Sequence, residues 1–363
     1  MAHGEAVSRR IFLYAGSYTH QSSVGIRIYD ATDPEGFLIE TGQVTDIEHP
    51  SFLAVHPNGQ VLYAVSETAS EGGGGLVAFR IDPLDGSLSV IDRTTSQGAA
   101  PCYVSLDAHG RYVYIANYVS GSIAVYSLES DGRFGELVAV HKHVGTGPSQ
   151  RQDRPHAHCV IADPGGDTVY AVDLGADRIF RYGHIQSGTE KGLVLRDSLS
   201  LDPGSGPRHL VFHPDQPVAF LVCELESTVS TFGVDSATGE LNRLQTLSTL
   251  PPDFAGESIG AEVRVHPDGR HVYVSNRGHD SIAVFRFHGF GEPLESLGHV
   301  PSAGHTPRSF AVHPFGRSLI VANQDSDTIV PFTIEAHSGI PQQHGVSSAA
   351  SQPVFLTFVE MEP

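Results

Sequence analysis

The chain has 363 residues, 40% of them hydrophobic and 17% charged, which is enough apolar material for a sizeable core. Its formal net charge is −19, and it has no lysine-rich run, so nucleic acid and anionic membranes are not expected as partners. The 39 glycines and 23 prolines recur at short intervals, as is typical of many strands joined by turns.

The N-terminal segment, residues 1–10, is expected to be a flexible extension. The first apolar run, residues 11–16, is too short to span a membrane or to form the core of a signal peptide. The three cysteines, Cys102, Cys159 and Cys223, are widely separated and form no CxxC motif. An odd, low number of cysteines favours reduced thiols and a cytoplasmic location.

A repeated segment follows along the chain, with a period of about 50 residues. Each copy has an apolar stretch, a tight turn around HPxG or a variant of it, and then an alternating run of β-branched and aromatic residues. This pattern predicts a β-hairpin. The copies span residues 51–67, 102–118, 158–174, 208–224, 261–277 and 308–324.

Most hairpins are followed by a second pair of expected strands, such as residues 122–128 and 281–287. Four short strands per repeat describe a propeller blade. Residues 353–359 match the first strand of a repeat and residues 9–18 match the second, so the two ends of the chain are expected to share a blade and close the ring. The sequence therefore predicts an all-β protein, with one seven-bladed propeller of four-stranded antiparallel blades over residues 11–363.

The antiparallel hairpin sorts residues between the two edges of the ring. The HPxG turns lie at one edge, where a structural role is expected for His56, His213, His266 and His313. The start of each first strand and the end of each second strand lie at the other edge. The last-but-one position there is mostly small and polar, as suits hydrogen bonds at strand ends.

Two positions at this second edge differ from repeat to repeat, which is unexpected for structural residues. The first opens each hairpin and is occupied by Ser51, Cys102, His158, Arg208, Ala261, Arg308 and Val354. The second closes each hairpin and is occupied by Glu67, Tyr118, Leu174, Glu224, Arg277, Gln324 and Tyr18. Because the ring brings all of them to one mouth of its channel, we expect a ligand site there.

Four of these residues are the candidate catalytic group: His158, Glu224, Arg208 and Arg277. A histidine and a carboxylate can share proton transfer, while two guanidiniums can hold an anionic group and stabilise an oxyanion. Taken singly, each could be an ordinary strand-end residue, and Glu224 could simply neutralise Arg208. Their common register at one mouth favours a site.

Further residues are expected to contact the substrate: His156, Arg308, Glu67, Tyr118, Asn276 and Gln324. The loop of residues 146–153 directly precedes His156 and could cover the site, whereas the glycine run at 70–75 is expected to be a hairpin tip. His209 and Glu262 are expected to pack or hydrogen-bond between blades.

A metal at the mouth is a weaker hypothesis. The two histidines of HAH, with Asp173, Asn117 and Asn276, offer ligands for a divalent ion. Their spacing is not diagnostic, and strand-end hydrogen bonding explains the oxygen-bearing side chains. No metal and no cofactor is therefore expected.

Several motifs resemble the seven-bladed β-propeller lactonase family, which includes propeller-type 6-phosphogluconolactonases and carboxymuconate lactonizing enzymes. They are RPHAHCV (154–160), GPRHLVFHP (206–214), CELESTV (223–229), SNRGHDSIAVF (275–285), and TPRSFAVHP with VANQDSDTIV (306–330). The resemblance covers nearly the whole chain. It implies site roles for His158, Arg208, Glu224 and Arg277, the four residues that the register also selects. One departure is Cys223, where the family often has asparagine.

The resemblance implies a lactone hydrolase acting on a small anionic sugar lactone, with 6-phosphoglucono-δ-lactone as the first expectation. A carboxylated muconate, closed to a lactone by a cycloisomerase, is one alternative. A propeller that binds a partner without catalysis is another, because one fold can carry many functions. The oligomeric state, and which of His158 and Glu224 acts as the base, stay open.

Overall fold

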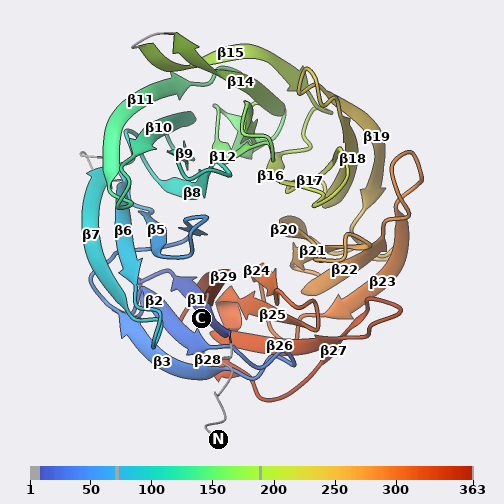
Figure 1. Cartoon of the computed structure of the whole chain (residues 1–363). Helices are drawn as coiled ribbons and strands as arrows, with labels where there is room; N and C mark the ends of the chain where they lie inside the picture. Colours follow the sequence, from blue (N-terminus) through green and yellow to red (C-terminus); the bar gives the residue numbers. More distant parts are fainter. Residues whose placement is uncertain (1–8, 70–72, 188–189, 362–363) are drawn as a thin grey trace, which may run out of the picture.

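The computed structural model describes residues 9–69, 73–187 and 190–361, which form seven antiparallel sheets around a common axis (Figure 1). Blade 1 contains β29 (Pro353–Met361), β1 (Arg10–Ser17), β2 (Ile26–Asp30) and β3 (Ile39–Val44). Blade 2 contains β4 (Leu53–Val55), β5 (Val61–Ser66), β6 (Gly75–Ile81) and β7 (Leu88–Thr95). Blade 3 contains β8 (Pro101–Leu106), β9 (Tyr112–Asn117), β10 (Ser122–Leu128) and β11 (Phe134–Lys142).

The remaining four blades repeat the same order from the axis outwards. Blade 4 contains β12 (Ala157–Ala162), β13 (Thr168–Asp173), β14 (Arg178–Ser187) and β15 (Glu190–Ser200). Blade 5 contains β16 (Pro207–Phe212), β17 (Val218–Cys223), β18 (Thr228–Val234) and β19 (Leu241–Ser248). Blade 6 contains β20 (Ile259–Val265), β21 (His271–Arg277), β22 (Ser281–Arg286) and β23 (Glu295–Pro301). Blade 7 contains β24 (Pro307–Val312), β25 (Ser318–Asn323), β26 (Thr328–Ile334) and β27 (Pro341–Gln343), and β28 (Ser348–Ala349) also pairs with β26.

The ring closes through blade 1, where β29 pairs antiparallel with β1 from Arg10↔Met361 to Ser17↔Pro353. A closed ring leaves no blade without a neighbour, which protects the strand edges that would otherwise template aggregation. The predicted seven-bladed architecture and its shared terminal blade are therefore confirmed.

Two residues of the expected N-terminal extension are held against the propeller. Arg10 opens β1, one residue before the predicted start of the domain, and Arg9 forms an ion pair with Glu360 at 2.6 Å. The rest of that extension, and residues 70–72 of the glycine run, lie outside the described residues.

The histidines of the HPxG turns join neighbouring blades. In each of them Nδ1 accepts the backbone N–H two residues later, and Nε2 donates to a backbone carbonyl of the next blade. This pair of bonds explains the recurrence of the motif. The Nε2 pairs are His56–Gly110, His213–Gly269, His266–Gly316 and His313–Ala31, at 3.3, 2.9, 2.8 and 3.0 Å.

At the opposite edge, buried asparagines near the ends of the second strands fasten the segment that leaves the preceding blade. Each donates its amide to a backbone carbonyl there, which satisfies both groups away from water. The pairs are Asn117–Ser96, Asn276–Thr249 and Asn323–Ser302, at 3.0, 2.7 and 3.0 Å.

Aromatic side chains from several blades meet near the axis. The ring of Phe52 lies 4.0 Å from that of Tyr103 and 3.8 Å from that of Phe355, and His209 stands edge-on to Tyr103 at 5.2 Å. The inner strands of the blades, among them β8, β12, β16, β20 and β24, face the centre of the ring (Figure 1).

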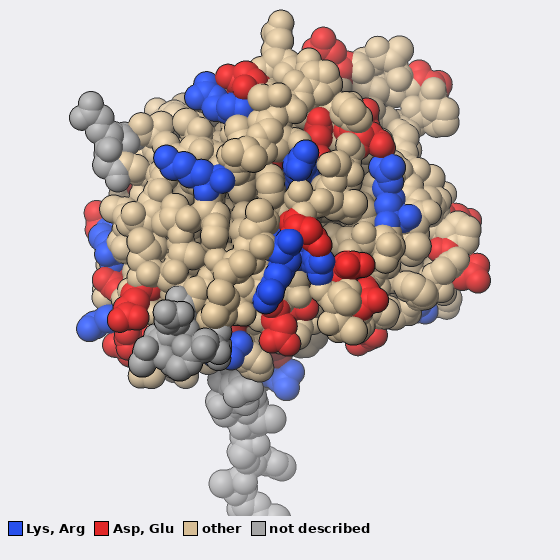
Figure 2. All heavy atoms as spheres, turned by 90° about the horizontal axis from the view of Figure 1, so that it is seen from above, with Lys and Arg blue, Asp and Glu red and all other residues tan. Residues whose placement is uncertain are grey.

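The side view of the ring shows acidic and basic side chains interspersed on that face (Figure 2). In the part of the chain that the structure describes, no helix has the length and apolarity needed to cross a membrane.

Candidate active site

The four candidate catalytic residues come together at one mouth of the channel. His158 lies on β12, Arg208 on β16 and Arg277 at the end of β21, while Glu224 directly follows β17. All four are buried. The register of the repeat therefore places three blades around one cluster.

Glu224 is the centre of this cluster. Its Oε2 accepts a hydrogen bond from Arg208 Nε at 2.9 Å and pairs with Arg277 Nη2 at 2.8 Å. Although burial opposes ionisation, the guanidiniums of Arg277 and Arg208 hold the pKa of Glu224 well below its ordinary value. The carboxylate is thus an anion at neutral pH that orients two cations.

Blade 6 fixes the other side of both guanidiniums. Arg208 Nη1 donates to the carbonyl of Ala261 at 2.6 Å, and Arg277 Nη2 donates to that of Gly260 at 2.9 Å. Burial lowers the pKa of Arg208 and lowers that of Arg277 to about 10, so both remain cationic at neutral pH. Rigid cations at a buried position are suited to stabilising developing negative charge.

His158 provides the neutral partner. Burial, followed by the positive charge of Arg208, lowers the pKa of His158 well below its ordinary value. Its Nδ1 lies 3.8 Å from Sγ of Cys102, and its ring stands edge-on to Tyr118 at 5.5 Å and to His209 at 5.2 Å. A neutral imidazole at this position can accept a proton.

His209 and Glu262 lie beneath the cluster, between blades 5 and 6, as predicted. His209 Nδ1 is 3.1 Å from Glu262 Oε1, and the guanidinium of Arg208 lies against the His209 ring. Burial raises the pKa of Glu262 and lowers that of His209 well below its ordinary value. This pair supports Arg208 from below.

Arg151 is a member of the site that the repeat did not reveal. It lies in the short 3-10 helix η1 (Gln150–Gln152), within the loop that was expected to cover the mouth. Gln152 is fully buried and bonds to blade 4, which anchors the loop. Arg151 Nη1 thereby reaches Glu224 Oε1 at 2.5 Å, and Nη2 donates to the hydroxyl of Tyr118 at 3.3 Å.

Arg151 differs from the other two arginines in exposure, because 44% of its side chain is open to solvent. The signal that could have found it was a cation in the loop that was expected to cover the mouth. Loop residues have no strand register, however, so their position could not be read from the repeat.

Several residues predicted to contact substrate border the same mouth. His156 stacks on Tyr118 with ring centroids 4.4 Å apart, and its Nδ1 donates to the carbonyl of that tyrosine. Arg308 and Gln324 line a cavity of about 360 Å³ together with Arg277. The cluster therefore opens onto a space bordered by cations.

Glu67 lies at the mouth on the side of blades 1 and 2. Its Oε2 accepts a hydrogen bond from the hydroxyl of Tyr18 at 3.1 Å, and the guanidinium of Arg308 lies 5.4 Å from the centre of the Tyr18 ring. Tyr18 and Glu67 line a neighbouring cavity of about 520 Å³.

Asn276 is not brought to the cavity. It is fully buried, its amide donates to the Thr249 carbonyl, and its Oδ1 accepts the Thr249 hydroxyl at 2.6 Å. Its side chain thus serves the seam between blades, which is the strand-end role expected of its position in the repeat.

Asp173, another oxygen ligand of the metal hypothesis, is similarly engaged. Asp173 accepts the backbone N–H of His156 and pairs with Nδ1 of His143, both at 2.7 Å. Asn117 donates its amide to the Ser96 carbonyl. These bonds account for Asp173 and for the amide nitrogen of Asn117, whereas Asn117 Oδ1 has no hydrogen-bond partner among the described residues.

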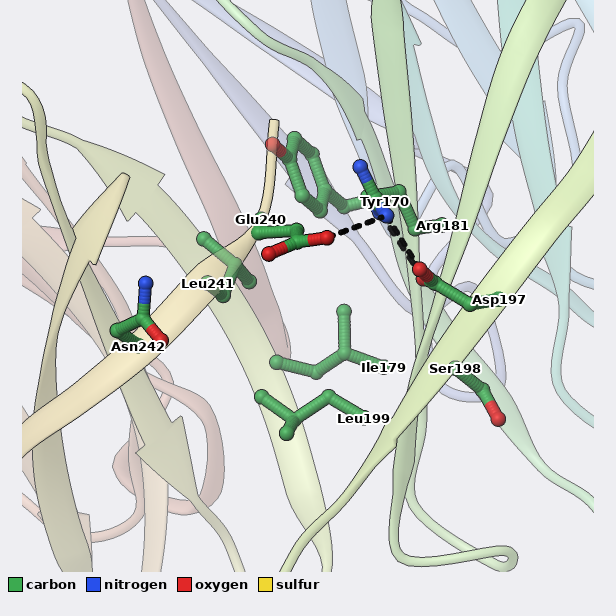
Figure 3. Close-up of a pocket in the computed structure, with 9 residues that line it drawn as sticks. All are labelled: Tyr170, Ile179, Arg181, Asp197, Ser198, Leu199, Glu240, Leu241 and Asn242. Carbon is green, nitrogen blue, oxygen red and sulfur yellow. Dashed lines mark hydrogen bonds and ion pairs between the residues drawn. The ribbon is translucent and has the colours of Figure 1, made fainter. Parts of the chain in front are cut away.

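A hollow of about 190 Å³ away from the mouth has a different character (Figure 3). Arg181 lies there between Asp197, which it contacts through Nε at 2.9 Å, and Glu240, 3.7 Å from its Nη2. The two carboxylates neutralise the charge of Arg181. Its ion pairs therefore join blade 4, which carries Asp197, to blade 5, which carries Glu240.

Fold and site together define a β-propeller with a buried imidazole and clustered guanidiniums at one mouth of its channel. Residues 12–358 match the family described as "Lactonase, 7-bladed beta-propeller", and the chain belongs to this family.

Individual relatives cover most of the chain. It is 36% identical over 299 residues to the 6-phosphogluconolactonase of Bacillus subtilis, which covers 82% of this chain and 83% of that protein. The structure of the periplasmic gluconolactonase of Pseudomonas aeruginosa is similar with a TM-score of 0.90 and 31% identity, over 97% of this chain and 100% of that one. A Lactobacillus plantarum protein is similar with a TM-score of 0.87 and 29% identity, over 96% and 99% of the two chains.

Proposed function

We propose that this protein hydrolyses 6-phosphoglucono-δ-lactone to 6-phosphogluconate. The observation that carries the proposal is the buried neutral imidazole of His158 beside two guanidiniums fixed by Glu224. Such a site offers a proton acceptor and oxyanion stabilisation together, the two requirements of lactone opening. The names of the relatives support the substrate class.

In the proposed reaction His158 accepts a proton from water as the water oxygen attacks C1 of the lactone. Arg208 and Arg277 stabilise the negative charge that develops on the carbonyl oxygen. The tetrahedral intermediate then collapses, the bond between C1 and the ring oxygen breaks, and the imidazolium returns its proton to that oxygen. Glu224 is assigned as the counter-ion that positions the arginines, because Arg208 and Arg277 occupy its Oε2 and Arg151 occupies its Oε1.

The phosphate of the substrate is assigned to the outer cations. Arg151 is exposed at the loop, and Arg308 borders the cavity that adjoins Arg277. Guanidiniums bind phosphate through paired hydrogen bonds, which gives both affinity and orientation. The net charge of −19 repels anions from most of the protein surface. The arginines outweigh this repulsion only near the mouth, so a phosphate dianion is expected to bind there.

The test compares hydrolysis of freshly prepared 6-phosphogluconolactone and gluconolactone with their spontaneous rates. We expect acceleration of the phosphorylated lactone, with a lower KM than for the other, and no effect of EDTA on the rate. Equal KM values would contradict the phosphate assignment. No acceleration of either lactone would contradict the proposal, and loss of carboxymuconate absorbance would then identify the lactonizing alternative.

A further inference from the structure

A second polar cluster lies at the opposite edge of the ring, in the turn of blade 6. Ligand atoms of His266, Asp268 and His271 all lie within 4.8 Å of one another. Nδ1 of His266 is 2.8 Å from Oδ1 of Asp268, and Nδ1 of His271 is 3.9 Å from the same oxygen. Two imidazoles and a carboxylate are ligands that borderline divalent metals accept.

His271 departs from the repeat and has no structural explanation within it. The residue that opens the second strand is Val61, Tyr112, Thr168, Val218 or Ser318 in blades 2, 3, 4, 5 and 7. His271 is 3% exposed, and among the described residues neither of its ring nitrogens has a hydrogen-bond partner. Buried polar groups are normally hydrogen-bonded, so the unpaired ring nitrogens of His271 indicate a ligand.

The geometry of His266 also indicates a missing cation. Its Nε2 must donate to the Gly316 carbonyl, 2.8 Å away, so the Nδ1 of the neutral ring carries a lone pair. That lone pair lies 2.8 Å from a carboxylate oxygen, and two electron-rich atoms repel at this distance unless a cation is shared between them. A proton would bridge only His266 Nδ1 and Asp268 Oδ1, whereas a metal ion could also bind a ring nitrogen of His271.

The surrounding groups hold the three side chains in place. The backbone of blade 7 lies against both rings, because a Cβ on Gly316 would be 2.6 Å from His266 and one on Gly339 would be 2.3 Å from His271. Arg270 donates its backbone N–H to Asp268 Oδ1 at 2.8 Å and its Nε to Oδ2 at 3.0 Å. Outer hydrogen bonds of this kind orient metal ligands.

We propose that His266 Nδ1, Asp268 Oδ1 and His271 Nδ1 bind a divalent cation of the zinc class. Tetrahedral zinc with bonds of about 2.0–2.1 Å places its ligand atoms roughly 3.3 Å apart, and the separations of 2.8 and 3.9 Å lie on either side of this value. The Asp268 side chain is 26% exposed, so water can complete the coordination. Binding replaces the 3.2 Å hydrogen bond from the Asp268 N–H to His266, and it ties the turn to the start of β21.

The test uses the full chain, stripped with EDTA and titrated with Zn²⁺ against a chromogenic chelator. We expect one tight equivalent in the wild type and an affinity lower by about 100-fold or more in His271→Val and in Asp268→Asn. Valine occupies the matching position of β5 and β17, so His271→Val should fold. Zn²⁺ should also raise the melting temperature of the wild type but not that of His271→Val.

His288→Gln is the matched control, because it removes a surface histidine that pairs with Glu295 at 2.9 Å in the same blade. Zinc affinity equal to that of the wild type is expected for it. The proposal is overturned if His271→Val and Asp268→Asn bind zinc as tightly as the wild type, or if the wild type binds none. Lactone hydrolysis does not enter this readout, so the result is independent of the proposed function.

Discussion

Replacing Glu224 with glutamine tests the arrangement of the site most directly. The change keeps the size of the side chain but removes the anion that Arg208 and Arg277 share. Both arginines are buried, with 3% and 9% of their surface exposed. Removing one partner of a buried ion pair costs about 3–5 kcal/mol. Glutamine can still accept a hydrogen bond, so we expect a loss near the lower limit, about 3 kcal/mol.

The loss is measured as a change in melting temperature and in lactone hydrolysis. At about 2 °C per kcal/mol for a chain of this size, the midpoint should fall by roughly 6 °C. The kcat/KM should fall by about 10²–10³-fold, because the guanidiniums lose the group that orients them.

Glu295→Gln is the control for this experiment. It removes an exposed carboxylate that pairs with His288, and such pairs contribute about 0–1 kcal/mol. Its melting temperature should stay close to that of the wild type. If Glu224→Gln melts within about 1 °C of the wild type, the reasoning that Glu224 is a buried counter-ion is refuted.

The remaining predictions concern the proton acceptor, the loop and acid stability. His158→Gln should lower kcat about 10²–10⁴-fold, and an unchanged kcat would remove His158 as the base. Because burial lowers the pKa of His158, the acid limb of the kcat/KM profile should lie below pH 6.5; a limb above that value would contradict the assignment. Arg151→Ala should raise KM about tenfold for the phosphorylated lactone but not for gluconolactone, with a stability change below about 1 kcal/mol because the side chain is exposed. The folded-state pKa values of His158 and His209 are depressed, so the unfolded chain binds more protons, and stability should fall as pH decreases below 6.5. The depressed pKa of Glu224 adds to this loss only below pH 4.5, the ordinary value of that carboxyl. Urea unfolding at pH 7, 6 and 5 measures this, and a rise in unfolding free energy towards pH 5 would contradict it.

The positions of those candidate site residues that lie on strands or at strand ends could be predicted from the sequence. Side chains alternate along a strand and antiparallel hairpins return to the same edge, so equivalent positions of different blades must meet at one mouth. The repeat by itself therefore predicts that His158, Arg208, Glu224 and Arg277 lie together. Asn276 shows its limit, because an amide at the correct edge can still turn into the seam between blades.

The sequence by itself therefore determined the seven blades, the closure of the ring by its two ends and the mouth at which the charged residues gather. These depend on a period repeated many times along the chain, and repetition makes the pattern independent of any single residue. The tertiary structure alone decided that Arg151 reaches Glu224 and that Glu224 is held as an anion while His158 is neutral. It also decided that the buried ring nitrogens of His271 have no hydrogen-bond partner within the part of the chain that the structure describes. Each of these depends on a loop conformation, a rotamer or the loss of water around one group, and such properties arise from contacts between segments distant in the chain.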